Sequence, residues 1–170
     1  KDRGGIGKGM AVVKMIHEGY HQKSDFINLI YYVCRKAEDI GGYGITLTDI
    51  PEICLQFEYV KAFWGKAEEG RRQARHFIVS FSNKELCTQE LMTLGWQIAA
   101  YYGYEFQVLW GVHADSANLH IHFVVNTVNY RNGKMLSEGY EDLKQLKLFV
   151  ANIENSFFRG KRKIISDMIR

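Results

Sequence analysis

The order of apolar and polar residues changes along the chain between the two-residue period of strands and the longer period of amphipathic helices. Short β-rich or alternating runs predict strands over Ala11–His17, Arg75–Ser82, Glu105–His113 and Leu119–Asn129. Apolar residues that recur every third or fourth position predict helices over Asp25–Glu38, Thr48–Trp64, Thr88–Tyr102 and Glu138–Phe158. Strands and helices are therefore expected to take turns along most of the chain.

Residues with strong conformational preferences mark where these elements begin and end. Ser24 is placed to cap the first helix, and Pro51 falls in the first turn of the second, where proline is tolerated. The GGYG run at Gly41–Gly44 predicts a break in the chain, and Gly103 predicts the end of the third helix. Arg131–Gly133 predicts a hairpin turn after the last strand.

The predicted strands indicate an α+β fold rather than a parallel doubly wound sheet. Leu119–Asn129 follows Glu105–His113 after a short loop, so the two are expected to pair as an antiparallel hairpin. We therefore expect a central, mostly antiparallel sheet flanked by helices, in a palm-like α/β sandwich. A single domain is predicted over residues 10–170, truncated from a longer protein, after a flexible leader or expression remnant at residues 1–9.

Composition limits the class of protein without defining it. A net charge of +3 permits a nucleic-acid partner but does not require one. The three cysteines are far apart and form no CxxC pair, which favours a reducing compartment over a disulfide framework. No apolar run approaches the ~20 residues of a membrane span, and no leader resembles a signal peptide, so we expect a cytoplasmic protein without a membrane partner.

Basic residues cluster in two places along the chain. The first cluster is Arg71, Arg72 and Arg75, and the second is Arg159, Lys161, Arg162 and Lys163. Charge alone favours a solvated face in each case over a binding surface.

The stretch HADSANLHIHFVVN, residues 113–126, carries the most specific chemical signal. His120 and His122 are two residues apart on a predicted strand, so both imidazoles project from one face. His113 ends the neighbouring strand, and the short loop brings it back beside the pair. Three converging imidazoles can bind a divalent transition-type ion and leave other coordination positions open. A single HxH pair would more often be structural, but the third histidine favours a metal site.

Other residues near this motif have more than one interpretation. Asp115 could orient a ligand histidine or act as a base, and it could equally cap the turn. A bound ion could activate water, or it could polarise a phosphodiester for attack by a side chain. Tyr31 and Tyr32 both lie off the apolar stripe of the first helix, so periodicity chooses neither as that nucleophile.

QKSDFINLIYYV followed by HADSANLHIHFVVN resembles the MobP-type relaxases, the mobilisation nucleases of the HUH endonuclease superfamily. In that family the catalytic tyrosine lies eight residues beyond the serine, and counting from Ser24 gives Tyr32. The family's metal motif, HxDxxNxHxH followed by an asparagine, matches His113, Asp115, Asn118, His120, His122 and Asn126. The RHFIVSFS strand resembles the strand between these motifs and would place His76 and Ser80 near the sheet. Tyr31, His17 and His21 remain alternative nucleophiles.

The resemblance implies a relaxase that nicks single-stranded or hairpin DNA at an origin of transfer. Tyr32 would attack the scissile phosphate, with Mn²⁺ or Mg²⁺ held by the three histidines and Asp115 as a possible base. Candidate DNA contacts are Arg71, Arg72, Arg75, Asn118 and Asn126, whereas Trp110 and Tyr43, which could stack on bases, are more typical of packing residues. Relaxosome accessory proteins and a coupling protein are the expected partners in a bacterial cytoplasm.

Three other functions are consistent with parts of the sequence. A rolling-circle replication initiator shares the HUH residues, but its tyrosine usually follows the histidines, whereas Tyr32 precedes them. A metal-dependent phosphodiesterase would use bound water instead of Tyr32. A non-catalytic DNA-binding domain would close its metal site with a fourth protein ligand, and no cysteine is near enough in sequence to supply one.

Overall fold

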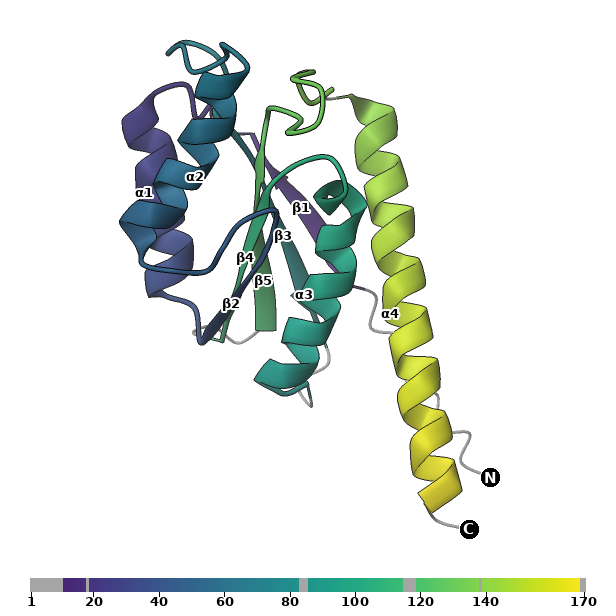
Figure 1. The fold of residues 1–170 in the computed structure, drawn as a ribbon. Coiled ribbons are helices and arrows are strands. Elements are labelled where there is room, and N and C mark those ends of the chain that lie inside the picture. The colour runs from purple at the N-terminus through teal and green to yellow at the C-terminus, as the bar shows by residue number, and fades with distance from the viewer. Residues whose placement is uncertain (1–10, 18, 83–85, 115–118, 138, 169–170) are drawn as a thin grey trace.

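The computed structural model describes residues 11–17, 19–82, 86–114, 119–137 and 139–168. Five strands form one sheet in the order β1-β3-β5-β4-β2, and every neighbouring pair is antiparallel (Figure 1). Their bounds are β1 Val12–Ile16, β2 Asp39–Tyr43, β3 Ala74–Phe81, β4 Val108–His113 and β5 Leu119–Asn126. The predicted α+β class and the hairpin between β4 and β5 are therefore confirmed.

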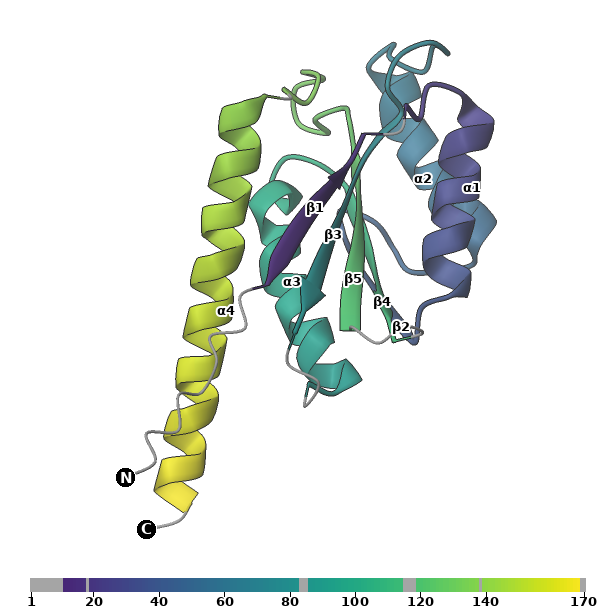
Figure 2. The same cartoon turned by 180° about the vertical axis from the view of Figure 1, so that it is seen from behind.

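Helices cover both faces of this sheet. Figures 1 and 2 show α1 (Lys23–Arg35) and α2 (Ile50–Phe63) on one face, with α3 (Thr88–Gly103) and α4 (Tyr140–Met168) on the other. Each face has its own hydrophobic core. Val124 of β5 packs with the α1 and α2 residues, whereas Phe123 and Val125 pack with those of α3 and α4. This alternation places the even-numbered residues of β5 under α1 and α2.

The first two helices begin close to where the sequence predicts them. Asp49 caps α2 by accepting a hydrogen bond from the Glu52 amide at 2.9 Å, as expected for a helix with proline in its first turn. The cap of α1 is different from the prediction. Gln22 occupies the cap position, and its backbone amide donates a hydrogen bond to the Asp25 carboxylate at 3.2 Å. Ser24 therefore lies inside the helix.

The predicted break at Gly41–Gly44 is wrong, because Gly41 and Gly42 lie within the edge strand β2. Glycine at position 41 serves packing rather than a turn. A Cβ atom there would lie 2.1 Å from the ring of Trp110, which is buried against β2. The actual turn residue is Gly44, whose φ of 65° is a conformation that favours glycine.

The remaining differences concern where elements end. The strands β4 and β5 are shorter than predicted, and α4 extends ten residues past the predicted end at Phe158, to Met168. Its C-terminal half projects beyond the sheet (Figure 1). The turn after β5 is confirmed: the Gly133 amide donates to the Asn129 carbonyl oxygen at 2.9 Å.

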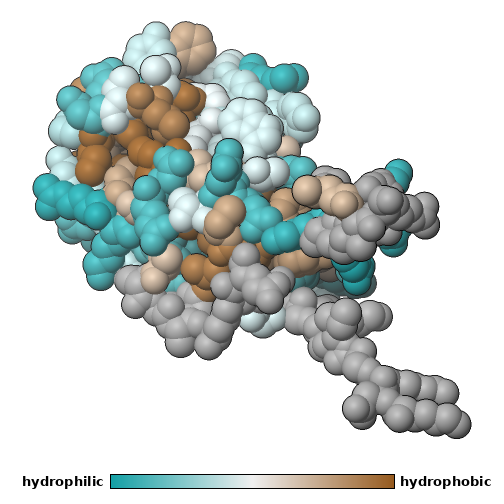
Figure 3. Space-filling view, turned by 90° about the horizontal axis from the view of Figure 1, so that it is seen from below, coloured by the Kyte–Doolittle hydropathy of each residue, from teal (hydrophilic) through white to brown (hydrophobic). Residues whose placement is uncertain are grey.

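Two further observations concern the surface and the chain ends. Figure 3 shows the end of the molecule at which β4 stops and β5 begins, where apolar patches are bordered by hydrophilic residues. None of the helices in the described ranges is both long and apolar enough to span a membrane. The predicted leader at residues 1–9 lies outside the described residues.

Candidate active site

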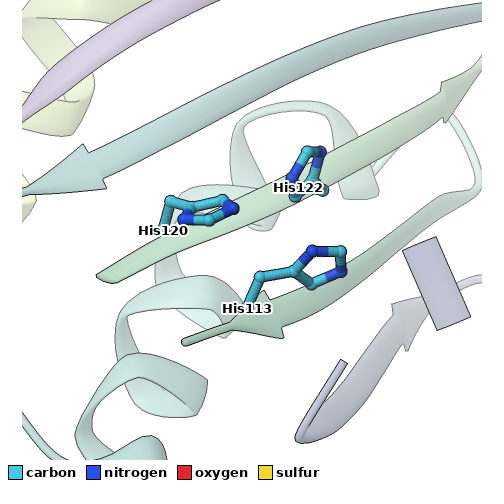
Figure 4. Close-up of side chains that lie close together, drawn as sticks. All are labelled: His113, His120 and His122. Carbon is cyan, nitrogen blue, oxygen red and sulfur yellow. The ribbon is translucent and has the colours of Figure 1, made fainter. Parts of the chain in front are cut away.

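Three histidines from adjacent strands converge on the face of the sheet that α1 covers (Figure 4). His113 ends β4 and is directly paired with His120 of β5, while His122 lies two residues further along β5. One ring nitrogen from each residue lies within 4.8 Å of the others. His113 and His122 are buried, and His120 is half-buried, so the cluster is open on one side.

Two of these rings are held by hydrogen bonds on the side away from the cluster. His113 Nε2 lies 2.9 Å from the carbonyl oxygen of Val33 on α1. His122 Nδ1 lies 2.9 Å from Nε2 of His76 on β3, and His76 Nδ1 lies 2.8 Å from the Tyr20 hydroxyl. Such outer contacts fix the orientation of imidazole rings and leave the opposite nitrogen to face the cluster.

Burial keeps His122 and His76 neutral. Removal from water, followed by the proximity of His113, lowers the pKa of His122 to about 3. The same two causes lower the pKa of His76 to about 4. Neutral imidazole is the form that binds metal ions.

The residues present fit a metal ion. His122 Nε2 is buried and has no hydrogen-bond partner among the described residues, which is costly unless another group satisfies it. A metal ion among the three rings, at the usual metal–nitrogen distance of about 2.1 Å, would satisfy this atom. The three histidines can therefore hold one divalent ion.

Tyr32 of α1 lies directly beside the cluster. Its ring centroid is 5.4 Å from that of His122 and 5.7 Å from that of His113, and its side chain is 41% exposed. The neighbouring Tyr31 instead packs under the guanidinium of Arg35, 4.7 Å from its ring centroid. The structure therefore brings Tyr32, and not Tyr31, to the histidines.

An open hollow of about 550 Å³ lies next to Tyr32 and His122. Its lining includes Tyr20 and His76 and, on α1, the polar side chains of Asp25 and Asn28. His17 and His21, the alternative nucleophiles, are exposed and are not among the lining residues. Lys36 adds positive charge nearby, with its ammonium 5.1 Å from the Tyr32 ring centroid.

Two predicted DNA contacts are buried and committed to other partners. Arg75 lies on the opposite face of the sheet, where it is 4% exposed and forms an ion pair with Asp142 of α4. Asn126 is fully buried, and its amide donates to the Phe57 carbonyl oxygen and the Gln107 side chain. Both side chains are therefore packed in the interior and are not exposed for contact with a phosphate.

The other predicted site residues lie at the surface or outside the described ranges. Arg71 is exposed and pairs with Glu68 at 2.8 Å, and Arg72 is half-buried. Both precede β3, at the opposite end of the sheet from the histidine cluster. Asp115 and Asn118 lie outside the described residues.

The candidate stacking residues belong to a separate aromatic group. Trp110 is buried, and Tyr43 stacks on Trp96 with their ring centroids 4.4 Å apart. Trp110 therefore serves packing, the role that the sequence analysis favoured for it over base stacking.

Two residues of the site were not assigned a role from the sequence. His76 was expected near the sheet, and the two-residue period of its strand could have placed it on the same face as Ile78 and Ser80. Tyr20 carries no such signal, because it lies in the loop between β1 and α1.

Comparison with known proteins identifies the class. The family model described as "Relaxase: MobA/VirD2-like, nuclease domain" matches residues 32–157, a range that includes Tyr32 and all three clustered histidines. The chain belongs to this family of relaxase nuclease domains.

Individual relatives agree with this assignment. Two Staphylococcus aureus proteins, both named protein rlx, are 27% identical over 121 residues and 30% identical over 105 residues. The first alignment covers 71% of this chain and 35% of the relative, and the second covers 62% and 32%. The chain thus spans about a third of the length of these curated relatives.

A solved structure shares the fold. It comes from work on the molecular basis of vancomycin resistance transfer in Staphylococcus aureus, and it superposes with a TM-score of 0.64 at 10% identity. The match covers 89% of this chain and 94% of that one. At this identity the likeness establishes the architecture alone.

Proposed function

We propose that this domain nicks single-stranded DNA at an origin of transfer by metal-assisted tyrosine transesterification. The observation that carries the proposal is the position of Tyr32 beside a cluster of histidines that can hold a metal ion. The ring centroid of Tyr32 lies 5.4 Å from that of His122, a member of this cluster. The nucleophile and the metal ligands come from α1, β4 and β5, so the fold assembles them from distant parts of the chain. Membership of the relaxase family supports the same chemistry.

The reaction exchanges one phosphate ester for another. The Tyr32 oxygen attacks the scissile phosphorus in line, a new bond forms between them, and the bond from phosphorus to the 3′ oxygen breaks. The proton lost by the Tyr32 hydroxyl ends on the departing 3′ oxygen, so the net charge is unchanged. Because the phosphotyrosyl ester keeps the energy of the broken bond, a free 3′ hydroxyl can reverse the reaction and rejoin the strand.

The histidines and the hollow prepare the site for this attack. His113, His120 and His122 would present ring-nitrogen lone pairs to a divalent ion, Mn²⁺ or Mg²⁺, which would supply Lewis-acid stabilisation of the charge that develops on the phosphate. Attack by Tyr32 requires its hydroxyl group to lose a proton. Asp115 is the proposed base that assists its deprotonation.

Single-stranded DNA is the proposed substrate because the site lies in a concave hollow. Unpaired nucleotides are flexible enough to bring a phosphate into this space beside Tyr32. A duplex is stiff and carries its phosphates on a convex surface, which fits a concave site poorly. Arg71, Arg72 and Asn118 remain proposed contacts to flanking DNA, and a hairpin at the origin would give specificity. Relaxosome accessory proteins and a coupling protein are the proposed partners of the whole protein.

The test is adduct formation on a labelled single-stranded oligonucleotide that contains a candidate origin of transfer. The reaction is run with Mn²⁺ or with EDTA and resolved on a denaturing gel. Wild type should form a covalent protein–DNA adduct only with Mn²⁺. Tyr32→Phe and His120→Ala should abolish it, and the matched control Tyr31→Phe should retain it.

Each other result assigns a different chemistry. An adduct that survives in Tyr32→Phe but not in Tyr31→Phe would move the nucleophile to Tyr31. Cleavage without an adduct would support a phosphodiesterase that uses bound water. DNA binding without cleavage on several origins would overturn the proposed reaction.

A further inference from the structure

A chain of three side chains extends from the histidine cluster into the interior of the site. His122 Nδ1 lies 2.9 Å from His76 Nε2, and His76 Nδ1 lies 2.8 Å from the Tyr20 hydroxyl. The chain links β5, β3 and the loop between β1 and α1. His76 is only 5% exposed, so its contact with His122 is buried, and its contact with Tyr20 is partly buried.

The direction of these hydrogen bonds follows from the role of His122. A ligand nitrogen needs its lone pair, so metal binding through Nε2 requires the proton of His122 to be on Nδ1. That N–H then donates to His76 Nε2, and the remaining proton of His76, on Nδ1, donates to the Tyr20 oxygen. Each ring consequently has one tautomer that satisfies both of its neighbours.

We infer that His76 and Tyr20 are positioning residues that fix the tautomer and the ring orientation of His122 for metal binding. This inference rests on the proposed metal site. The rings of His76 and His122 stack with centroids 5.2 Å apart and planes inclined by 25°, so packing and hydrogen bonding restrain the same rotation. Tyr20 is itself held by its backbone, whose carbonyl oxygen accepts from the Gln73 amide at 2.7 Å.

The cluster uses two different outer partners for two of its ligands. His113 is held at Nε2 by a backbone carbonyl oxygen and therefore faces the cluster with Nδ1, whereas His122 is held at Nδ1 and faces it with Nε2. The chemistry of His76 has a further consequence. A neutral imidazole accepts a hydrogen bond less strongly than a carboxylate would, so the His122 Nε2 lone pair would donate less charge to a bound ion, and that ion would keep more of its Lewis acidity.

The first measurement is Mn²⁺ affinity by calorimetry, with the metal as the only ligand. His76→Leu keeps apolar bulk but removes the acceptor, and it should weaken Mn²⁺ binding about 10- to 100-fold. His76→Gln returns an acceptor oxygen close to the position of Nε2 and should recover most of that loss. Tyr20→Phe should cause a smaller loss, and the matched control His17→Leu, on an exposed histidine, should cause none.

The second measurement is the ¹⁵N chemical shifts of labelled histidine in the metal-free protein. Imidazole in water favours the Nε2–H tautomer, so wild-type His122 and His76 should both stand out with their protons on Nδ1. His76→Leu removes the His76 signal, and the His122 signal should then also lose this signature, while the variant retains the melting temperature of a folded domain. A structural role alone would not move the tautomer or be rescued by glutamine.

The outcomes separate this inference from the proposed function. If wild type binds one Mn²⁺ and His120→Ala abolishes binding, but His76→Leu binds as tightly as wild type, the inference is overturned and the metal site stands. If wild type binds no Mn²⁺, both are overturned. The inference is supported if His76→Leu weakens Mn²⁺ binding, His76→Gln restores it, and the tautomer of His122 changes as expected.

Discussion

The ring of Tyr32 meets the ring of His122 edge to face, with centroids 5.4 Å apart and planes inclined by 82°. One of these residues lies on α1 and the other on β5, ninety positions later in the sequence. The contact is possible because Leu29, Ile30 and Val33 bury the adjacent side of α1 against the sheet and leave Tyr32 at the edge of that buried side.

This contact predicts a selective magnetic effect of bound Mn²⁺ on tyrosine. Paramagnetic broadening falls steeply with distance, so ring signals of Tyr32 should disappear at lower Mn²⁺ concentrations than those of Tyr31. Two-dimensional NMR of ring-labelled tyrosine would measure it, with Tyr32→Phe to assign the signal and Mg²⁺ as a diamagnetic control. Equal broadening of all ten tyrosines would contradict a site beside Tyr32.

Replacing a helical glycine by alanine should lower the stability of the fold at one position and raise it at another. A Cβ at Gly95 on α3 would lie 2.6 Å from the buried Trp110 ring, so Gly95→Ala should destabilise the fold by about 1–3 kcal/mol. Gly160 on α4 has no neighbour within 4 Å, and Gly160→Ala should stabilise it by about 0.5–1 kcal/mol. Urea unfolding measures both, and equal effects would argue against the packing of Trp110 under α3.

The ion pair between Arg75 and Asp142 predicts a loss of stability when the carboxylate is removed. Asp142→Ala leaves Arg75 buried without its partner and also removes the acceptor for the Tyr102 hydroxyl, 3.0 Å away. The free energy of unfolding should fall by about 2–4 kcal/mol, somewhat less than for breaking a fully buried pair, because the Asp142 side chain is partly exposed. Glu68→Ala, which breaks the exposed pair with Arg71, is the matched control and should leave the melting temperature nearly unchanged.

The cysteines should react with an alkylating reagent at different rates, and the rate for Cys34 should depend strongly on pH. Burial, followed by the proximity of Cys54, raises the pKa of Cys34 to about 11, so only about one thiol in a thousand is ionised at pH 8. Cys87 is exposed and should react with iodoacetamide first. Because the pKa is raised, alkylation of Cys34 should accelerate as the pH rises from 8 toward 10, as peptide mass spectrometry can follow. Rapid labelling of Cys34 at pH 8 would contradict its half-buried position on α1.

Much of the fold could be predicted because local patterns and burial agree. The apolar stripe of Phe26, Ile30 and Val33 predicts α1, and all three residues are buried in the structure. The spacing of His120 and His122 likewise puts both on one face of β5, because side chains alternate along any strand. The pairing of His113 with His120 follows from the short connection between their strands.

Other features depend on which elements meet, and a single stretch of sequence cannot specify that. Gly41 and Gly42 have the composition of a turn, yet they form a strand because β4 supplies hydrogen bonds and Trp110 occupies the space above Gly41. Arg75 reads as a surface residue by charge, yet it is buried because α4 brings Asp142 to it.

The sequence by itself determined the α+β class, most of the elements, and the three histidines, because these depend on periodicity and short loops. Only the tertiary structure showed that Tyr32, and not Tyr31, lies beside the histidines, since both lie off the apolar stripe and their positions depend on how α1 rests on the sheet. The same packing joined Tyr20, His76 and His122. Contacts between residues far apart in sequence require the folded chain, because no local preference encodes the distance between them.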